Sequence, residues 1–145
     1  MRISVSTDDM EKFPDKIREY LGLAGGDRIK QAVYAGALDV HRHAIEAISA
    51  PKSGVLVKVS KTGRPHKRSA AGEAPAVETG RLKTSLHVTA SSDKAEAEVV
   101  APTSYAVHLE FGTRDMRMRP FLKPALDDNR EQIKERVLRA MMRGA

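Results

Sequence analysis

The chain has 145 residues, no cysteine and a formal net charge of +6. A chain of this length favours one domain, residues 1–145, and the lack of cysteine excludes disulfides, thiolate metal sites and a cysteine nucleophile. The first residues contain no apolar core of the signal-peptide type, and no apolar run approaches the ~18 residues of a membrane span, so we expect a soluble protein made in a cytoplasm, without membrane contact.

Residues 1–24 are predicted to form a strand and a short helix. Over residues 2–6 apolar and polar side chains alternate, which is typical of an edge strand. Asp8 or Asp9 can cap a helix that Pro14 interrupts or restarts.

A stronger helix is predicted over about residues 27–49. Asp27 is its candidate cap, and Pro51 forbids its continuation. Its apolar residues recur every three or four positions and lie on one face, which we expect to cover a sheet. They are Ile29, Val33, Ala37, Val40, Ala44 and Ile48.

The excess positive charge lies in residues 51–72. Here there are six basic residues and no acidic one, whereas the other 19 basic residues balance the 19 acidic residues of the chain. Residues 55–59 are typical of a strand that runs into a turn, and residues 69–75 look too small and turn-rich to pack against anything. We therefore expect a long, flexible, basic, hairpin-like excursion at about residues 52–76. Its basic residues are Lys52, Lys58, Lys61, Arg64, Lys67 and Arg68.

The second half of the chain predicts a hairpin and a last helix. Residues 82–88 lead into a strand that ends at a turn near residues 91–93, and residues 95–100 form its antiparallel partner. A proline favours the start of a helix over about residues 124–142. Its apolar stripe is Leu126, Ile133, Val137 and Met141. The fold class is therefore predicted as α+β, with a small antiparallel-rich β-sheet packed against this helix and the helix of about residues 27–49.

Residues 105–126 place scarce aromatic side chains around a polar loop. Phe111 and Phe121 are two of the three phenylalanines in the chain, and we expect both to be core anchors that hold out a contact loop, residues 113–119. Tyr105 is expected to be buried, and Gly112 to have a positive φ. We assign structural roles to Tyr105, Glu110, Phe111, Gly112, Pro120, Phe121 and Leu122.

Two polar positions have competing interpretations. Glu110 is predicted to pair with Arg81 or to face a neighbouring subunit, because no second carboxylate or base has the fixed relation to it that acid-base catalysis needs. Thr79 supplies a hydroxyl cap and Gly80 a hinge, so that a helical turn starting at Arg81 and Leu82 can lead into the next strand. The Thr79–Leu82 motif would also be explained if it served only to connect two elements of the fold.

Two segments resemble a known family. Residues 74–86, APAVETGRLKTSL, resemble the signature P-V-x-T-G-R-L-x-x-S-I/L of small tail-component proteins, which are encoded in the head-to-tail joining module of long-tailed bacteriophages. Residues 105–126 resemble the second signature, Y-A-x-x-x-E-F-G-T followed by R-P-F-L-x-P-A-L. The order of elements agrees over about residues 27–142, although residues 114–119 are more basic than the family pattern.

The resemblance implies a structural virion protein of a bacteriophage or prophage that acts in head-tail joining or tail completion. It implies a homo-oligomeric ring, a hexamer in the virion, between the capsid connector and the tail. The isolated subunit can be a monomer in solution. The expected partners are other copies of the chain and the phage connector and tail proteins, and the expected locations are the virion tail or neck and, during assembly, the host bacterial cytoplasm. A neck-ring protein and a tail terminator both fit.

The basic residues allow functions of different classes. In the assembly hypothesis, residues 51–72 contact an acidic surface of an adjacent subunit or of the connector, and residues 114–119 belong to a second contact surface. In the alternative, the chain is a small basic DNA-binding protein whose residues 52–68 contact phosphates without reading sequence, because that segment has no stacking aromatic residue. A loop that contacts only solvent, or one that lines a ring through which DNA passes, also fits. The candidate contact residues are Lys58, Lys61, Arg64, Lys67, Arg68, Arg114, Arg117 and Arg119.

No sequence pattern indicates catalysis or a metal site. His41 and His43 stand two residues apart on the predicted helix, so they point about 200° apart and cannot chelate one ion. No nucleophile elbow, Gly-x-Gly-x-x-Gly motif or Walker-type loop occurs. We therefore predict no enzymatic activity, no cofactor and no catalytic or metal-binding residue.

Overall fold

A computed structural model describes residues 1–6, 26–58 and 65–143 of the chain. The elements of these ranges are β1 (Arg2–Ser6), α2 (Gly26–Ser49), β2 (Leu56–Lys58), β3 (Pro65–Lys67), α3 (Arg81–Ser85), β4 (His87–Ala90), β5 (Glu96–Val100), α4 (Ala106–Phe111) and α5 (Leu122–Met142). The short helix predicted after the first strand lies outside the described residues.

Three strands form an antiparallel sheet in the order β1-β5-β4. Val99 of the central strand lies opposite Ile3 on one side and Val88 on the other, so these three side chains share one face. Val99 is completely buried. The predicted edge strand and hairpin are thus confirmed, and β1 brings the start of the chain next to the middle of the sheet.

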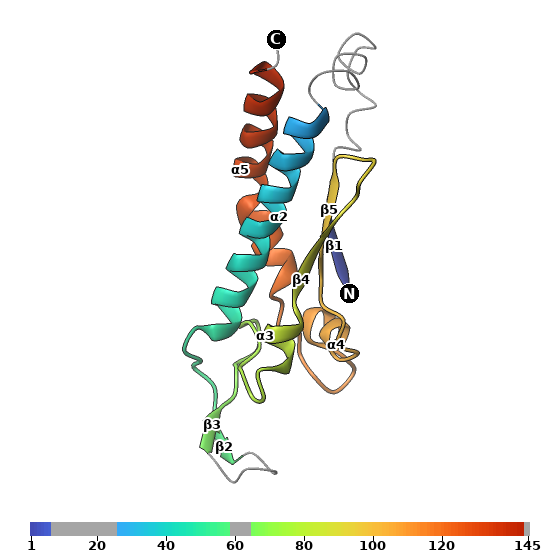
Figure 1. Cartoon of the computed structure of the whole chain (residues 1–145). Helices are drawn as coiled ribbons and strands as arrows, with labels where there is room; N and C mark the ends of the chain where they lie inside the picture. Colours follow the sequence, from blue (N-terminus) through green and yellow to red (C-terminus); the bar gives the residue numbers. More distant parts are fainter. Residues whose placement is uncertain (7–25, 59–64, 144–145) are drawn as a thin grey trace.

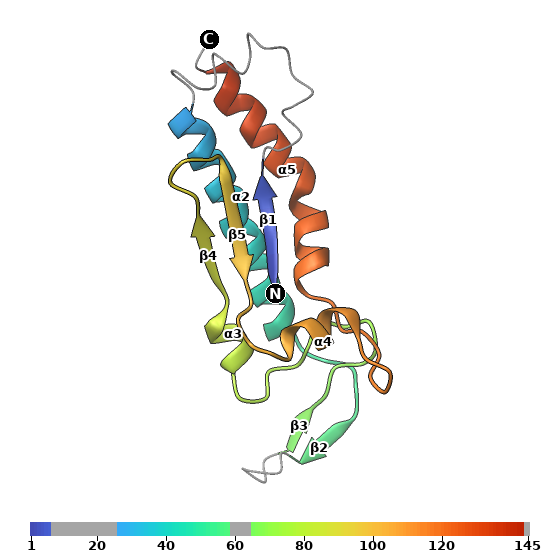
Figure 2. The same cartoon turned by 90° about the vertical axis from the view of Figure 1, so that its right-hand side faces the viewer.

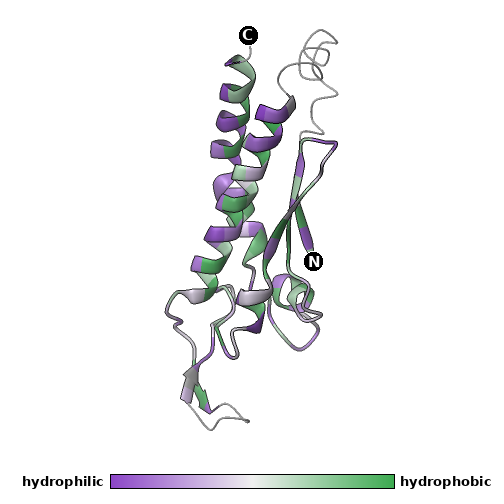
Figure 3. Cartoon of the chain, viewed as in Figure 1, coloured by the Kyte–Doolittle hydropathy of each residue, from purple (hydrophilic) through white to green (hydrophobic). Residues whose placement is uncertain are grey.

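Helix α2 covers the inner face of this sheet, with α5 beside it (Figures 1 and 2). All six apolar residues predicted on one face of α2 are buried. Figure 3 shows hydrophobic residues on the sides where α2, α5 and the sheet face one another. Burial of a side chain such as Ile29, which is 1% exposed, stabilises the fold by about 1.5–3 kcal/mol. The α+β class with two long helices on a small sheet is confirmed.

Helix α5 contributes the second half of the helical layer. Of its predicted stripe, Ile133 is buried, and Leu126, Val137 and Met141 are partly buried against the core. Leu122 and Ala125 complete the buried face at the start of the helix.

Polar contacts also fix the seam between the two long helices. The side chain of Arg136 approaches that of Asp39, with Nη1 at 2.6 Å from Oδ2. The buried amide of Asn129 donates to the carbonyl oxygen of Ala125 at 2.8 Å and, in the tautomer whose Nδ1 accepts, to His43 at 3.0 Å. Both amide hydrogens are thus satisfied, as burial of a polar group requires.

A separate two-stranded hairpin projects from one end of the body. Strands β2 and β3 pair antiparallel, and both views show them beyond the end of α2 (Figures 1 and 2). We call residues 55–58 and 65–68 the arm. The predicted hairpin is confirmed, while Lys61 and Arg64 lie outside the described residues.

Candidate assembly surface

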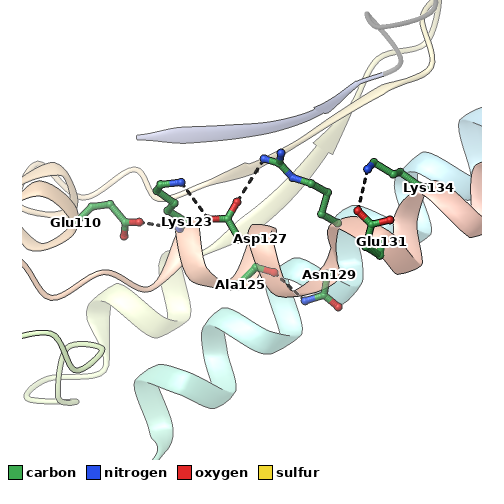
Figure 4. Close-up of polar contacts among 8 residues, drawn as sticks. Glu110, Lys123, Ala125, Asp127, Asn129, Glu131 and Lys134 are labelled. Carbon is green, nitrogen blue, oxygen red and sulfur yellow. Dashed lines mark hydrogen bonds and ion pairs between the residues drawn. The ribbon is translucent and has the colours of Figure 1, made fainter.

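The carboxylate of Glu110 binds the start of α5. Glu110 lies in α4 and is 3% exposed. Its Oε2 accepts the backbone N–H of Phe121 at 2.9 Å and of Leu122 at 3.1 Å, and its Oε1 accepts that of Lys123 at 2.7 Å. Figure 4 shows the side chain pointing toward the first turn of α5. The helix dipole and the unpaired N–H groups of a first turn both favour a carboxylate there.

These bonds account for the position at which α5 begins. The first four N–H groups of an α-helix have no partner inside the helix. Here three of them bind Glu110, and Pro124 has no N–H group. The N-cap residue, Phe121, makes no side-chain cap. Because the cap comes from another element, the helix begins at Leu122 rather than at the predicted Pro124.

Both roles predicted for Glu110 were therefore wrong. Its carboxylate is buried against backbone N–H groups, so it does not face a neighbouring subunit. Arg81 is exposed, and the bonds of Glu110 go to the start of α5 instead. Glu110 is a structural residue that joins the two halves of the 105–126 motif.

The two phenylalanines of this motif have opposite environments. Phe121 is 1% exposed and lies in the core, as predicted, whereas Phe111 is 66% exposed, so the prediction of a second anchor was wrong. The inward face of α4 consists of Ala106, Leu109 and Glu110. Because successive helical residues point about 100° apart, the residue after Glu110 points outward. Tyr105 is 38% exposed, so its predicted burial was also wrong.

Gly112 ends α4 in a conformation that only glycine adopts readily. Its φ is 77° and its ψ is 178°, which confirms the predicted positive φ. A Cβ atom here would lie 2.8 Å from the carbonyl oxygen of Met116 and 2.9 Å from the backbone nitrogen of Met118. The same Met116 oxygen accepts the N–H of Thr113 at 2.8 Å. The loop after α4 is thus folded tightly on itself.

Two of the three arginines in this loop are available for contact. Arg114 and Arg117 are exposed. Arg119 is half-buried, and its backbone N–H donates to the carbonyl oxygen of Leu109 at 2.6 Å. Its buried Nε has no hydrogen-bond partner among the described residues. Arg119 therefore anchors the loop, and Arg114 and Arg117 carry its exposed charge.

The Thr-Gly-Arg-Leu motif forms a hinge and a helical turn, as predicted. Gly80 has a φ of 76°, α3 starts at Arg81, and Leu82 is buried. The hydroxyl of Thr79 accepts the N–H of Arg81, the first residue of α3, in a long hydrogen bond of 3.4 Å, while the N-cap residue itself is Gly80. The N–H of Thr84 closes the turn by donating to the carbonyl oxygen of Gly80 at 2.9 Å.

The arm carries exposed basic side chains at its described positions. Lys58, Lys67 and Arg68 are all exposed. The N–H of Arg68 donates to the carbonyl oxygen of Val55 at 3.0 Å and continues the pairing of β2 and β3. Three predicted contact residues therefore project together from the body.

The chain that returns from the arm is fixed by Glu73. Its carboxylate accepts the N–H of Ser53 at 3.1 and 3.2 Å and that of Ala70 at 2.7 Å. Hydrogen bonds from Ser53, and then from Ala70, hold the pKa of Glu73 below its ordinary value. Ser69 is 4% exposed, so the expectation that residues 69–75 pack against nothing was wrong.

Lys52 lies on the chain that leads from α2 into the arm and is attached to that helix. We call residues 51–54 and 69–73, which lead into and out of the arm, the arm base. The Nζ atom of Lys52 donates to the carbonyl oxygen of Ala47 at 2.5 Å, in the last turn of α2. Partial burial lowers the pKa of Lys52, and the nearby Glu73 opposes this effect. Lys52 is thus a helix-end contact, while the charges farther along the arm remain exposed.

The arm base and the loop after α4 are bonded to each other. The N–H of Gly72 donates to the carbonyl oxygen of Met118 at 3.0 Å. Both views show the arm and this loop at the same end of the molecule (Figures 1 and 2). The two segments predicted for separate contact surfaces are therefore neighbours in the fold.

Sequence reasoning missed the exposed apolar side chains at this end. Val55 is 74% exposed, Leu56 65%, and Met118 56%. The apolar pattern around Val55 predicted a strand. It could not show that this strand pairs with β3 in a separate two-stranded sheet, which leaves its apolar side chains exposed. The pattern of the loop likewise did not distinguish Met118 from a core methionine.

The described residues include no group of three or more His, Cys, Asp or Glu side chains that could hold a metal ion. His41 Nε2 lies 3.1 Å from the carbonyl oxygen of Leu86, and His43 contacts Asn129, so the two histidines face different elements. In the same parts of the chain, no helix has the length and apolar character needed to cross a bilayer.

Comparison with known proteins identifies one family. Residues 11–112 match the family model described as "Bacteriophage HK97-gp10, putative tail-component". A search of curated proteins and a search of solved structures found no match. The matched range contains the Thr-Gly-Arg-Leu motif and α4, and it ends before residues 119–126, whose resemblance rests on their own sequence. Since the match spans more than half of the chain, this protein belongs to the HK97-gp10-like family of bacteriophage tail components.

Proposed function

We propose that this protein is a structural subunit of a bacteriophage or prophage virion that acts in head-tail joining or tail completion. The family match over residues 11–112 carries this proposal. The subunit forms a ring, sixfold in the virion, between the capsid connector and the tail, and it is a monomer before assembly. It is present in the host cytoplasm during assembly and in the tail or neck of the finished particle.

The shape of the subunit supports a ring. A cyclic ring uses heterologous contacts, so each subunit must present two different surfaces to its two neighbours. The body is long, with α5 along one flank and the edge strand β4 along the other (Figure 2). Flanks of such different structure suit contacts of this kind.

We further propose that the protein is not an enzyme and takes no cofactor. Glu110 is the buried carboxylate that would otherwise be the strongest candidate for acid-base chemistry. Three backbone N–H groups bind its two oxygens. This arrangement supports a structural role for the residue, with assembly driven by packing and charge pairing.

One observation favours a second candidate function, DNA binding. Lys58, Lys67 and Arg68 project from the arm, and residues 51–72 contain no acidic side chain. Such a group of cations suits phosphate contacts that are independent of sequence. A ring through which DNA passes would combine both functions, and we place assembly first because the family match supports it.

Deletion of the gene from its phage tests the primary proposal. Lysates of the deletion mutant should contain separate heads and tails in negative-stain electron micrographs, because the joining layer is missing. Expression of the wild-type protein from a plasmid should restore joined, infectious particles. Normal yields of joined particles from the deletion mutant would rule out this function.

A further inference from the structure

Large apolar side chains are exposed among the basic residues at the arm end of the molecule. On the arm, Val55 is 74% and Leu56 is 65% exposed; at the end of α4 and in the loop that follows it, Phe111 is 66% and Met118 is 56% exposed. The bond between Gly72 and Met118 connects the two groups through the backbone. We call these apolar and basic residues together the end surface. Its members are Val55, Leu56, Lys58, Lys67, Arg68, Phe111, Arg114, Arg117 and Met118.

The apolar part of the end surface points to a protein rather than a nucleic acid as its ligand. Exposed apolar groups rimmed by polar side chains mark protein contact sites, and Phe, Met and Arg are enriched in such sites. Phosphate groups are bound by cations and hydrogen-bond donors, and the apolar side chains of Val55, Leu56 and Met118 supply neither. DNA binding alone therefore leaves this half of the surface unexplained.

The charge of the end surface restricts the partner further. Its five basic residues are exposed, and Asp115 is the acidic residue of the same loop. Glu73 is already bonded to backbone N–H groups of the arm base. Two copies that met through this surface would bring like charges together, which opposes association, whereas an acidic partner complements it.

We propose that the end surface docks onto an acidic protein other than this chain, in the adjacent layer of the virion. This inference rests on the function proposed above and names the partner of its basic residues. The long helices run along the body and the arm lies at its end (Figure 1), so in a ring built through the flanks the end surface faces the next layer. Apolar contacts of Leu56, Phe111 and Met118 hold the partner, and the surrounding cations select an acidic one.

The arm base is prepared for this contact before the partner arrives. Glu73 joins Ser53 to Ala70, and Gly72 joins the returning chain to Met118. These bonds join the two segments below the arm to each other and the returning segment to the loop, which lowers the ordering cost of binding.

Joining in vitro tests the inference with the full chain. Extracts of the gene-deleted phage supply heads and tails, and purified protein is titrated into them while plaque-forming particles are counted. The variant carrying Leu56→Ser, Phe111→Ser and Met118→Ser should need roughly tenfold or more protein than wild type for half-maximal joining, because apolar centres carry most interface energy. Met142→Ser, 70% exposed at the far end of α5, is the matched control and should behave as wild type. The melting temperatures of both variants should equal that of wild type.

Charge variants test the nature of the partner. Arg114→Glu with Arg117→Glu should also weaken joining about tenfold, whereas Arg114→Lys with Arg117→Lys should retain it. If the Glu variant joins as well as wild type, the partner is not acidic and the proposal is wrong.

The remaining outcomes separate this inference from the function on which it rests. If wild type and the triple-Ser variant need the same protein concentration for half-maximal joining, the end surface is not a docking site, while the proposed joining function still holds. If wild type itself restores nothing, the proposed function fails, and the inference fails with it. If light scattering shows a dimer of wild type that the triple-Ser variant does not form, a second copy of the chain occupies the surface. If the triple-Ser variant loses duplex DNA binding in parallel with joining, the surface is a nucleic-acid site. Either result overturns the proposal.

Discussion

The Oε1 atom of Glu110 accepts the backbone N–H of Lys123 at 2.7 Å, across 13 positions of the chain. Glu110 belongs to the Glu-Phe-Gly-Thr part of the 105–126 motif, and Lys123 follows its Arg-Pro-Phe-Leu part. The bond therefore closes the loop that carries Arg114 and Arg117. A side chain of one signature caps the helix that the other signature starts.

Replacement of Glu110 by Ala should destabilise the fold by about 2–4 kcal/mol, because three N–H groups at a buried helix start lose their acceptor. Glu110→Gln should cost about 1–2 kcal/mol, since one oxygen still accepts. Urea unfolding followed by circular dichroism measures both values. The control Glu131→Ala, at an exposed position of α5, should change stability by no more than about 0.5 kcal/mol. An equally small effect of Glu110→Ala would show that the cap is unimportant.

Gly112→Ala should destabilise more than Gly80→Ala. Both glycines have a positive φ, 77° and 76°. Gly80, with ψ −8°, is left-handed, which costs a side chain about 1–2 kcal/mol, whereas Gly112, with ψ 178°, lies in a region that side chains avoid more strongly. Only at Gly112 would the new Cβ also approach the backbone within 3.0 Å, while at Gly80 nothing lies within 4 Å. Thermal unfolding should therefore separate the two variants by about 1–2 kcal/mol. Equal destabilisation by both would mean that the loop relaxes to accept the methyl group.

Protonation of Glu73 should release the arm base. The folded-state pKa of Glu73 is lowered, so its stabilising contribution is complete above the ordinary value of 4.5 and is lost as the pH falls through the folded pKa. The amide proton shifts of Ser53 and Ala70 should titrate together in that acidic range in NMR spectra. Titration of these two amides near neutral pH would contradict the assignment.

Glu73→Gln should loosen the arm base at neutral pH as well. The neutral amide accepts backbone N–H groups less strongly than the carboxylate. Trypsin should then cut faster after Lys67 and Arg68, as measured by mass spectrometry of timed digests. Glu78→Gln, an exposed position farther along the same segment, serves as the control and should digest at the wild-type rate.

Duplex DNA should bind the isolated protein only weakly, with a Kd of about 10⁻⁴ to 10⁻⁶ M at physiological salt. Replacement of Lys61, Arg64, Lys67 and Arg68 by Ser should make log K less dependent on log salt, by about 0.9 for each phosphate that the variant no longer neutralises. Filter binding at two salt concentrations measures both quantities. Tight, salt-sensitive binding by wild type would favour the DNA function over assembly.

Structural features that depend on residues close together in the chain could be predicted from the sequence. The apolar face of α2 follows from spacings of three and four residues, and the end of the helix follows from Pro51. The positive φ of Gly112 follows from the chemistry of one residue and its turn. The family assignment also came from local motifs, because the Thr-Gly-Arg-Leu and Glu-Phe-Gly-Thr segments are short.

What the sequence determined by itself is therefore the two long helices, the strands of the small sheet and of the arm, the position of the basic excess and the family. Helix α4 was not predicted, because its apolar run is too short to show a helical period. Only the tertiary structure decided the partner of Glu110, the outward direction of Phe111 and the attachment of the arm through Glu73. A carboxylate can accept from a guanidinium or from backbone N–H groups, and a phenylalanine can lie in a core or an interface. Packing between segments distant in the chain chooses among these, and it placed the apolar and basic groups together at one end.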